Sequence, residues 1–288
     1  MTRASLYDRV AEEAASVVIH RYSTSFGLAS KLLDSGARQH VENIYALVRL
    51  ADEIVDGEAA AAGLTAADAA SQLDALERET RHAMATGYST NLIVHAFALT
   101  ARETGFGEEL TTPFFASMRT DLSATAHDEA SFDSYVYGSA EVVGLMCLRA
   151  FLLGHEYSPE QLARLQAGAR ALGAAFQKVN FLRDLSADFR ELGRSYFPGI
   201  RVDSFSEADK NRILDDIDND LRMSAAVIPD LPAGSRRAVV LAQRLFAELA
   251  SRLRATPASR LVSTRVRVPT AIKLRIAAGA ALGRTSKT

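Results

Sequence analysis

Three observations predict a single all-α domain. Apolar residues recur at helical intervals along most of the chain, and no segment shows the alternating pattern of a half-buried strand. Alanine, leucine and arginine dominate the composition. No linker is long or polar enough to mark a domain boundary. We therefore expect one helical domain over residues 1–288.

Turn signals place the ends of the expected helices. The helical pattern is broken by glycines and prolines, namely Gly87, Gly105, Gly107, Pro159, Pro198, Gly199, Pro229, Pro232, Pro257 and Pro269. In chain order, helices are expected at residues 5–20, 37–57, 67–86, 91–103, 108–125, 131–154, 159–191, 206–228, 233–254 and 269–282. The alanine-rich stretch 57–70 is expected to be a loop that leads to an exposed helix.

The composition limits the class of protein. With 288 residues, 48% of them hydrophobic, the chain can bury a sizeable core. A net charge of −2 gives no reason to expect a nucleic acid partner, and the single cysteine, Cys147, excludes an intrachain disulfide. Residues 1–16 lack an apolar signal core, and the longest apolar run, 142–153, is interrupted by Arg149 and too short to span a bilayer. We expect a soluble cytoplasmic protein.

An acidic stripe marks the otherwise apolar segment 45–57, YALVRLADEIVDG. A helix that is apolar on every side is usually buried, and buried carboxylates are costly unless they are paired or bound to metal. At about 100° per residue, Arg49, Asp52, Glu53 and Asp56 fall within roughly a third of the helix circumference. The charges therefore share one face.

A second polar stripe lies in the segment 172–198. Its members Gln177, Asn180, Asp184 and Asp188 are spaced i, i+3, i+7 and i+11 on one helix face, beside apolar neighbours. Each stripe alone is compatible with a solvated face that carries i,i+3 ion pairs. If the two stripes face each other, their like charges repel and require cations between them.

Oxygen ligands of this kind suit a hard cation. Mg²⁺ prefers carboxylate and amide oxygens and keeps coordination positions open for phosphate oxygens, and Mn²⁺ is an alternative. Two such stripes predict a metal site that ionises a diphosphate, beside an apolar wall that shelters a carbocation from water.

These segments resemble the squalene/phytoene synthase family of head-to-head prenyl diphosphate synthases. YALVRLADEIVDG resembles the first aspartate-rich motif of the family, and NFLRDLSADFRELGRSYFP resembles the second. YVYGSAEVVGLM resembles its central helix, YSTSF its Ser-x-Ser-Phe element and STRVRV a late basic element. The pieces occur in the family's order from Ser23 to Arg267. The resemblance implies an isoprenoid-synthase-type helical bundle around a deep central cavity.

The resemblance also implies roles for individual residues. The implied metal ligands are Asp52, Glu53, Asp56, Asn180, Asp184 and Asp188. The implied substrate-binding residues are Ser23, Ser25, Arg49, Gln177, Asn180, Arg183, Arg194, Tyr196 and Arg265. Tyr135 would lie over the reacting allylic carbons and complete a catalytic set with Asp52, Asp56, Asp184 and Asp188.

Three residues depart from the family pattern. Glu141 replaces a small residue of the central motif, Phe246 replaces a common tyrosine, and Tyr22 replaces the histidine of some members. An unpaired carboxylate facing a hydrocarbon tunnel would be costly. We therefore expect Glu141 to reach the polar mouth of the cavity, with pairing to a basic residue such as Arg149 as the alternative.

The implied activity is the condensation of two identical allylic diphosphates through a cyclopropyl diphosphate. The favoured hypothesis is that two molecules of geranylgeranyl diphosphate are condensed to phytoene. Squalene, dehydrosqualene or presqualene diphosphate synthesis from farnesyl diphosphate is the alternative, with NADPH needed only for squalene. A non-catalytic binding or assembly factor is an alternative of another class. The tail from Arg260 onward is basic and contains no acids, so it is either a peripheral membrane contact or an ordinary basic helix end. The sequence does not indicate the oligomeric state.

Overall fold

A computed structural model describes residues 5–55, 58–123, 126–192 and 195–282, without the side chains of residues 60 and 187–192, and confirms the all-α class. The first half contains α1 (Leu6–Tyr22), α2 (Thr24–Ser30), α3 (Ser35–Val55), α4 (Glu58–Ala61), α5 (Ala66–Thr86), α6 (Leu92–Thr104), α7 (Glu108–Asp121), α8 (Glu129–Val136), the π-helical turn η1 (Tyr137–Glu141) and α9 (Val142–Leu152). The second half contains α10 (Pro159–Leu192), α11 (Glu207–Val227), α12 (Ala233–Ala255), α13 (Ala258–Leu261) and α14 (Thr270–Ala281), with 3₁₀ turns η2 (Val202–Ser204) and η3 (Ile228–Asp230). In the described ranges the β pairing is one isolated bridge between Ala126 and Ser195.

Local sequence signals explain most helix ends. Ser5, Thr65 and Ser206 each cap a helix start with a side-chain oxygen, in a reciprocal capping box with the third helical residue. Gly87 and Gly105 end α5 and α6 with positive φ, a conformation that favours glycine. These ends agree with the sequence prediction to within about two residues.

The sequence prediction missed the three shortest helices, α2, α4 and α13. Helices of four to seven residues are too short to show a 3.6-residue period. The expected helix at 131–154 is instead α8 and α9 joined by η1. Within the described residues, this run Glu129–Leu152 is the one stretch that could cross a membrane by length and composition, although half of its most apolar window is buried inside the fold.

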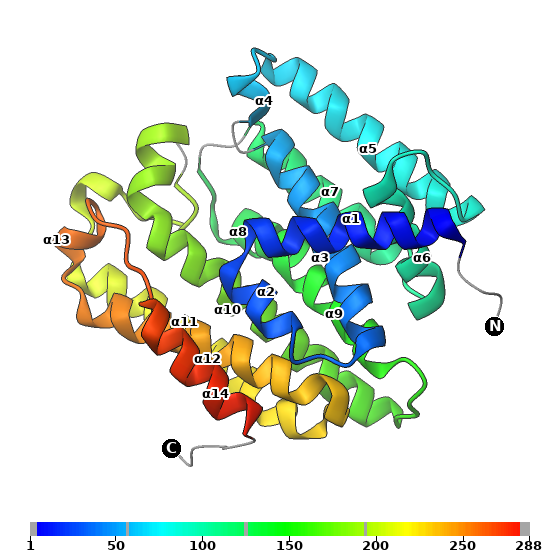
Figure 1. Cartoon of the computed structure of the whole chain (residues 1–288). Helices are drawn as coiled ribbons and strands as arrows, with labels where there is room; N and C mark the ends of the chain where they lie inside the picture. Colours follow the sequence, from blue (N-terminus) through cyan, green and yellow to red (C-terminus); the bar gives the residue numbers. More distant parts are fainter. Residues whose placement is uncertain (1–4, 56–57, 124–125, 193–194, 283–288) are drawn as a thin grey trace.

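Two hydrophobic cores flank the centre of the molecule. One core joins α3, α5, α6, α7 and α9 and includes Leu47 and Phe114. The other joins α10, α11 and α12 and includes Leu182 and Leu214. In Figure 1 the long helix α10, which belongs to the second core, passes through the middle of the bundle.

Two glycines allow η1, α9 and α10 to pack closely. A Cβ on Gly144 would lie 2.5 Å from the carbonyl oxygen of Ala169, and a Cβ on Gly173 would lie 2.5 Å from that of Ala140. Any side chain at either position would push the helices apart. This contact brings the wall formed by η1 and α9 against α10.

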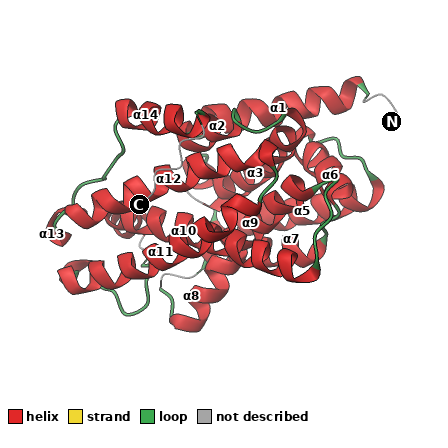
Figure 2. Ribbon diagram, turned by 90° about the horizontal axis from the view of Figure 1, so that it is seen from below, coloured by secondary structure: helices red, strands yellow, loops and turns green. Residues whose placement is uncertain are grey.

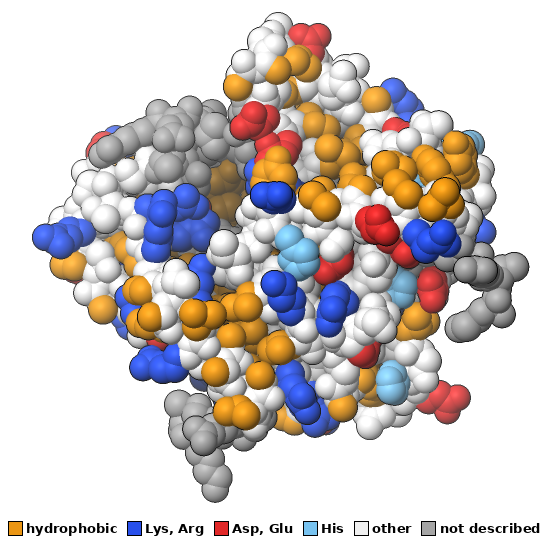
Figure 3. Space-filling model, in the orientation of Figure 1, with side chains coloured by type: hydrophobic (Ala, Val, Ile, Leu, Met, Phe, Trp, Pro, Cys, Tyr) orange, Lys and Arg blue, Asp and Glu red, His pale blue; other side chains and the backbone are white. Residues whose placement is uncertain are grey.

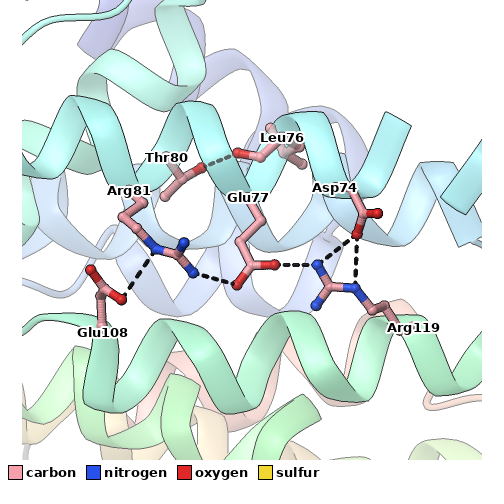
Figure 4. Close-up of polar contacts among 7 residues, drawn as sticks. All are labelled: Asp74, Leu76, Glu77, Thr80, Arg81, Glu108 and Arg119. Atoms are coloured by element: carbon pink, nitrogen blue, oxygen red, sulfur yellow. Dashed lines mark hydrogen bonds and ion pairs between the residues drawn. The ribbon is translucent and has the colours of Figure 1, made fainter. Parts of the chain in front are cut away.

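An ion-pair network ties α5 to α7 (Figure 4). Arg119 on α7 donates to Asp74, at 2.9 Å from its Nε, and to Glu77 on α5. Arg81 donates to Glu77 at 3.2 Å, and its Nε lies 3.1 Å from Glu108 Oε2 at the start of α7. The network holds the outer helix α5 on the rest of the bundle.

Helices α1, α2 and α14 form one outer layer. Figure 2 shows them along the same side of the molecule, with α3 and α12 beneath them. α2 contacts both α1 and α14, although α14 follows it by some 240 residues of sequence. All three helices of this layer contribute residues to the wall of the cavity between α3 and α10.

Candidate active site

A cavity of about 1010 Å³ lies between α3 and α10, a volume at the large end of small-molecule sites. Along both helices the lining changes in the same direction. α3 contributes Ile44 and later Asp52, and α10 contributes Leu165 and later Asp184. The cavity therefore has an apolar interior and a polar end. The apolar interior includes a buried cluster of Leu148, Leu165, Ile228, Leu231 and Val239.

On α3, Arg49 organises the acidic stripe. Its guanidinium donates to Glu53, lies 3.9 Å from Asp52 Oδ2 and stacks over the ring of Tyr22 at 4.6 Å. Burial opposes the charged form, but the bond to Glu53 and the two carboxylates together raise the pKa of Arg49. Arg49 and Asp52 line the cavity, whereas Glu53 turns to Arg49 and does not.

On α10, two arginines hold Asp184. Arg183 Nε donates to Asp184 Oδ1 at 3.0 Å. From a segment 81 residues later, Arg265 approaches the same carboxylate, with Nε 2.7 Å from Oδ1 and Nη2 3.2 Å from Oδ2. Gln177 and Asn180 line the cavity on the same helix. The two stripes thus border one cavity, and each carries its own arginine partners.

The sequence suggested that the acids of the two stripes repel one another across the cavity. In the structure, Asp52 and Asp184 instead lie beside arginines. Within the described part of the chain, no three acidic, histidine or cysteine side chains gather closely enough to hold a metal ion. Asp56 and Arg194 lie outside the described residues, as does the side chain of Asp188. The carboxylate and amide oxygens of Asp52, Asp184 and Asn180 that line the cavity are of the type that Mg²⁺ prefers.

Positive side chains crowd the polar end. Lys273 lies there with Arg183, Arg265 and Arg267. Partial burial lowers the pKa of Lys273, and the charges of Arg183 and Arg267 lower it further. Such a cluster suits a polyanion. Lys273 and Arg267 were not among the site residues expected from the sequence, although the acid-free tail was a signal for them.

The Ser-x-Ser element lies at the same end. Ser23 and Ser25 both line the cavity. Ser23 Oγ accepts from the backbone N–H of Phe26 at 3.0 Å and caps α2. Lys273 on α14 donates to Thr24 Oγ1 at 2.9 Å, which brings the C-terminal helix onto this element.

A buried carboxylate that sequence reasoning missed anchors the two tyrosines of the site. The Tyr135 hydroxyl donates to Asp121, 2.8 Å from each carboxylate oxygen, and the Tyr196 hydroxyl lies 3.3 Å from Oδ1. Phe181 stacks on Tyr196 at 3.9 Å. All four side chains line the cavity. The only sequence signal for Asp121 was an acid near the end of an otherwise ordinary helix.

The π-helical turn η1 places one polar atom in the wall. Ser139 lines the cavity, and its buried hydroxyl has no hydrogen-bond partner among the described residues. π-helical turns occur frequently at functional sites. Beside Phe26 of the Ser-x-Ser element, Phe246 stacks on Phe176 at 3.9 Å, so this departure from the family pattern extends the apolar wall.

The favoured expectation for Glu141, the polar mouth of the cavity, was wrong, and the alternative, pairing with a basic residue, is confirmed with a partner other than Arg149. Glu141 does not line the cavity, and its Oε2 accepts from Arg170 Nε on α10 at 2.6 Å. Arg149, the partner named from the sequence, is exposed on α9, which follows η1 directly. Glu141 is the last residue of the π turn, where the wider helical path directs side chains differently from a regular α-helix. Glu141 therefore points away from the cavity and toward α10, with its side chain 16% exposed.

Comparison with a family profile identifies the class of this protein. The profile described as squalene/phytoene synthase matches residues 19–271. The chain belongs to the squalene/phytoene synthase family. Members of this family are prenyltransferases that act on prenyl diphosphates. The match confirms the resemblance inferred from the motifs.

Individual relatives are phytoene synthases by name. The 15-cis-phytoene synthase of Paracoccus sp. (strain N81106 / MBIC 01143) is 31% identical over 185 residues, which is 63% of this chain and 58% of that one. The 15-cis-phytoene synthase of Enterobacter agglomerans is 25% identical over 248 residues, covering 79% of this chain and 80% of that enzyme. The first of these matches thus spans less than two thirds of its relative.

Solved structures show the same fold. A dehydrosqualene synthase crystallised in complex with a ligand superposes with a TM-score of 0.78, 20% identity and coverage of 96% of this chain and 97% of the other. A squalene synthase from Alicyclobacillus acidocaldarius gives a TM-score of 0.73 at 19% identity, covering 88% of this chain and 96% of that one. At these identities the similarity establishes the isoprenoid-synthase-type helical fold.

Proposed function

We propose that this protein condenses two geranylgeranyl diphosphates head to head to give phytoene, in a Mg²⁺-dependent reaction. One observation carries the proposal. The cavity joins a long apolar interior to a polar end where arginines and carboxylates meet, and a prenyl diphosphate has the same division into a hydrocarbon chain and a polyanion. The relatives named 15-cis-phytoene synthase favour this product.

The polar end would bind the diphosphates. Arg49, Arg183 and Arg265 would donate to phosphate oxygens, together with Lys273. Ser23, Ser25, Gln177 and Tyr196, with Arg194, would complete the binding shell. Mg²⁺ held by Asp52, Asp56, Asn180, Asp184 and Asp188 would stabilise the charge that develops on the departing diphosphate, and Mn²⁺ would serve in the same way. Glu53, which pairs with Arg49 and does not line the cavity, would position that arginine instead of binding the metal.

The apolar interior would direct the carbon chemistry. In the first half-reaction, one allylic C–O bond breaks, diphosphate leaves, and the cation joins the double bond of the second substrate with loss of a proton, which gives a cyclopropyl diphosphate. In the second, this intermediate loses diphosphate, rearranges and loses another proton. Tyr135, held by Asp121, would lie over the reacting carbons, while Phe176 and Phe246 exclude water.

Product analysis tests the proposal. Purified protein is incubated with Mg²⁺ and either geranylgeranyl or farnesyl diphosphate, with and without NADPH, and the lipids are identified by mass. We expect a C40 product from geranylgeranyl diphosphate without NADPH, and none after removal of the metal by a chelator. Binding of both substrates without any product would favour a non-catalytic family member.

A farnesyl-specific synthase is the second candidate. A 4,4'-diapophytoene synthase of Staphylococcus haemolyticus (strain JCSC1435) is 27% identical over 205 residues, covering 70% of this chain and 66% of that enzyme. Formation of dehydrosqualene, or of squalene with NADPH, in preference to the C40 product would select this candidate.

A further inference from the structure

Ser139 carries a buried hydroxyl to which the fold gives no partner. The residue is 9% exposed and lines the cavity, and its Oγ has no hydrogen-bond partner among the described residues. A buried donor without an acceptor has lost its hydration without compensation, and such groups are rare in native proteins. A hydroxyl left in this state in a cavity wall is therefore a candidate to bond to the molecule that fills the cavity.

Two other serines of the cavity wall, Ser30 and Ser224, show how a helical hydroxyl is normally satisfied. A serine within a helix donates to a backbone carbonyl three or four residues before it. Ser30 Oγ donates to the Gly27 carbonyl at 3.2 Å, and Ser224 Oγ donates to the Leu221 carbonyl at 2.9 Å. A position in the cavity wall therefore does not by itself leave a hydroxyl unpaired.

The surroundings of the π turn η1 keep Ser139 from this local solution. The carbonyl four residues before it belongs to Tyr135, and that oxygen accepts from Ser117 Oγ on α7 at 3.2 Å. A Cβ on Gly138 would lie 2.1 Å from the same Ser117 Oγ, and a Cβ on Gly173 of α10 would lie 2.5 Å from a carbonyl oxygen of the turn. Because η1 is packed this tightly between α7 and α10, Ser139 is held in a fixed position in the wall.

Ser139 lies one helical turn inside the polar end of the cavity. The residues of this helical run that line the cavity include Tyr135, Ser139, Val143 and Cys147, at intervals of four. Tyr135 belongs to the polar end, since its hydroxyl donates to Asp121. Val143 and Cys147 pack against the hydrophobic core. Ser139 therefore lies where the polar lining gives way to the apolar lining.

The opposing helix α10 changes character at the same level. The Tyr135 ring lies 5.8 Å from that of Phe181, and the Ala140 carbonyl packs against Gly173. The position of Ser139 between Tyr135 and Ala140 therefore corresponds to the stretch of α10 between these two contacts. The cavity lining within that stretch passes from polar to apolar, in the order Asn180, Gln177 and Phe176.

The chemistry of the proposed substrate identifies the acceptor. Figure 3 shows Lys and Arg side chains (blue) bordering a hollow, with hydrophobic side chains (orange) deeper inside. A prenyl diphosphate with its anion among the basic side chains and its chain in the apolar interior has its ester oxygen at the junction between them. The hydrocarbon chain contains no hydrogen-bond acceptor. The ester oxygen is the diphosphate oxygen bonded directly to that chain, and Ser139 lies at its level.

We propose that Ser139 is a further catalytic residue, whose hydroxyl donates a hydrogen bond to the ester oxygen of an allylic diphosphate as the C–O bond breaks. The bonding electron pair passes to that oxygen, which leaves with the diphosphate, and the proton stays on the serine. The hydrogen bond strengthens as negative charge develops on the oxygen, so it lowers the barrier more than it tightens substrate binding. This role rests on the proposed function and adds to it a group that acts on the leaving oxygen.

Replacing Ser139 by Ala removes the hydroxyl and little else. Three quantities are measured: the Tm of the metal-free protein, kcat and KM for geranylgeranyl diphosphate with Mg²⁺, and the affinity with Mg²⁺ for the thiolo analogue, in which sulfur replaces the ester oxygen. Sulfur of this kind is a weak hydrogen-bond acceptor, so the analogue reports on the rest of the binding site. Ser224→Ala is the matched control, because that hydroxyl also lies in the cavity wall but is bonded to a backbone carbonyl.

We expect Ser139→Ala to raise Tm by about 2 °C, because an unsatisfied buried hydroxyl is removed, whereas Ser224→Ala should lower Tm. The kcat of Ser139→Ala should fall about 100-fold, and its KM should change by no more than about fivefold. Its affinity for the thiolo analogue should equal that of the wild-type protein. Ser139→Cys, which keeps a weaker donor, should have a kcat between those of Ser139→Ala and the wild type.

Unchanged kcat in Ser139→Ala would overturn the role of Ser139 and leave the proposed function standing. A lower Tm together with weaker binding of the thiolo analogue would make Ser139 a packing residue, and an equal loss of kcat in Ser224→Ala would also overturn the assignment. Wild-type protein that forms no product from any prenyl diphosphate would refute the proposed function and this role with it. If Ser139→Ala does not fold, Ser139→Cys replaces it, and a wild-type kcat in that variant would overturn the proposal.

Discussion

Replacing Asp184 by Asn separates the charge of this carboxylate from its shape. The side chain is 18% exposed and pairs with Arg183, whose Nε lies 3.0 Å from Oδ1, and with Arg265, whose Nε lies 2.7 Å from the same oxygen. Repulsion between facing carboxylates, as the sequence alone suggests, would make Asp184→Asn more stable. The structure predicts the opposite, because the substitution leaves two arginines without their shared anion.

The size of the expected stability loss follows from the solvent exposure of the two arginine partners. The Arg265 side chain is 53% exposed, so solvent weakens its pair with Asp184, whereas Arg183 is 23% exposed. Partly exposed pairs contribute up to about 1 kcal/mol each, and we expect a total loss of about 1 kcal/mol. For a chain of this size that lowers Tm by about 2 °C. Turnover should fall about 10²–10³-fold, as when one key electrostatic group is lost.

Calorimetric melting of the metal-free protein measures the first effect, and product formation with Mg²⁺ measures the second. Asp203→Asn is the control, because Asp203 pairs with Arg201 at an exposed site that does not line the cavity, and we expect little change in either quantity. A higher Tm for Asp184→Asn would refute the role given to the arginines. Full Mg²⁺-dependent turnover would refute the role of Asp184 in the site.

Four further substitutions test other parts of the structure. Burial lowers the pKa of His40, so the unfolded state takes up a proton that the native state resists, and stability falls as the pH drops below about 6.5. His40→Gln should remove up to about 1.4 kcal/mol per pH unit of that slope in urea unfolding, and an unchanged slope would contradict this. Gly144→Ala should lower stability by about 1–3 kcal/mol, since the new Cβ would lie 2.5 Å from the Ala169 carbonyl oxygen; an unchanged Tm would show that α9 moves freely. Arg119→Met should destabilise by about 1 kcal/mol, because it removes the guanidinium that bridges two acids of α5, and urea unfolding checks this. Glu141→Gln should leave the product mixture unchanged, since this carboxylate lies outside the cavity lining; a changed mixture would return it to the site.

Features that depend on a single helix could be predicted from the sequence. The faces that carry Asp52 and Asp184 follow from helical geometry, which relates each residue to neighbours three and four positions away. Capping residues and glycines placed most helix ends for the same reason. The all-α class and the family followed from these local patterns and from the order of the motifs.

Only the tertiary structure decided which side chains meet across helices. Arg265 reaches Asp184 over 81 residues of sequence, and Lys273 reaches Thr24 over 249. Such contacts depend on how each helix is rotated and how closely it packs against its neighbours. Neither property can be predicted from the hydrophobic periodicity of a single segment. Glu141 shows the consequence, because its place in the π turn η1 directs it toward Arg170 and away from the cavity that its place in the sequence suggested.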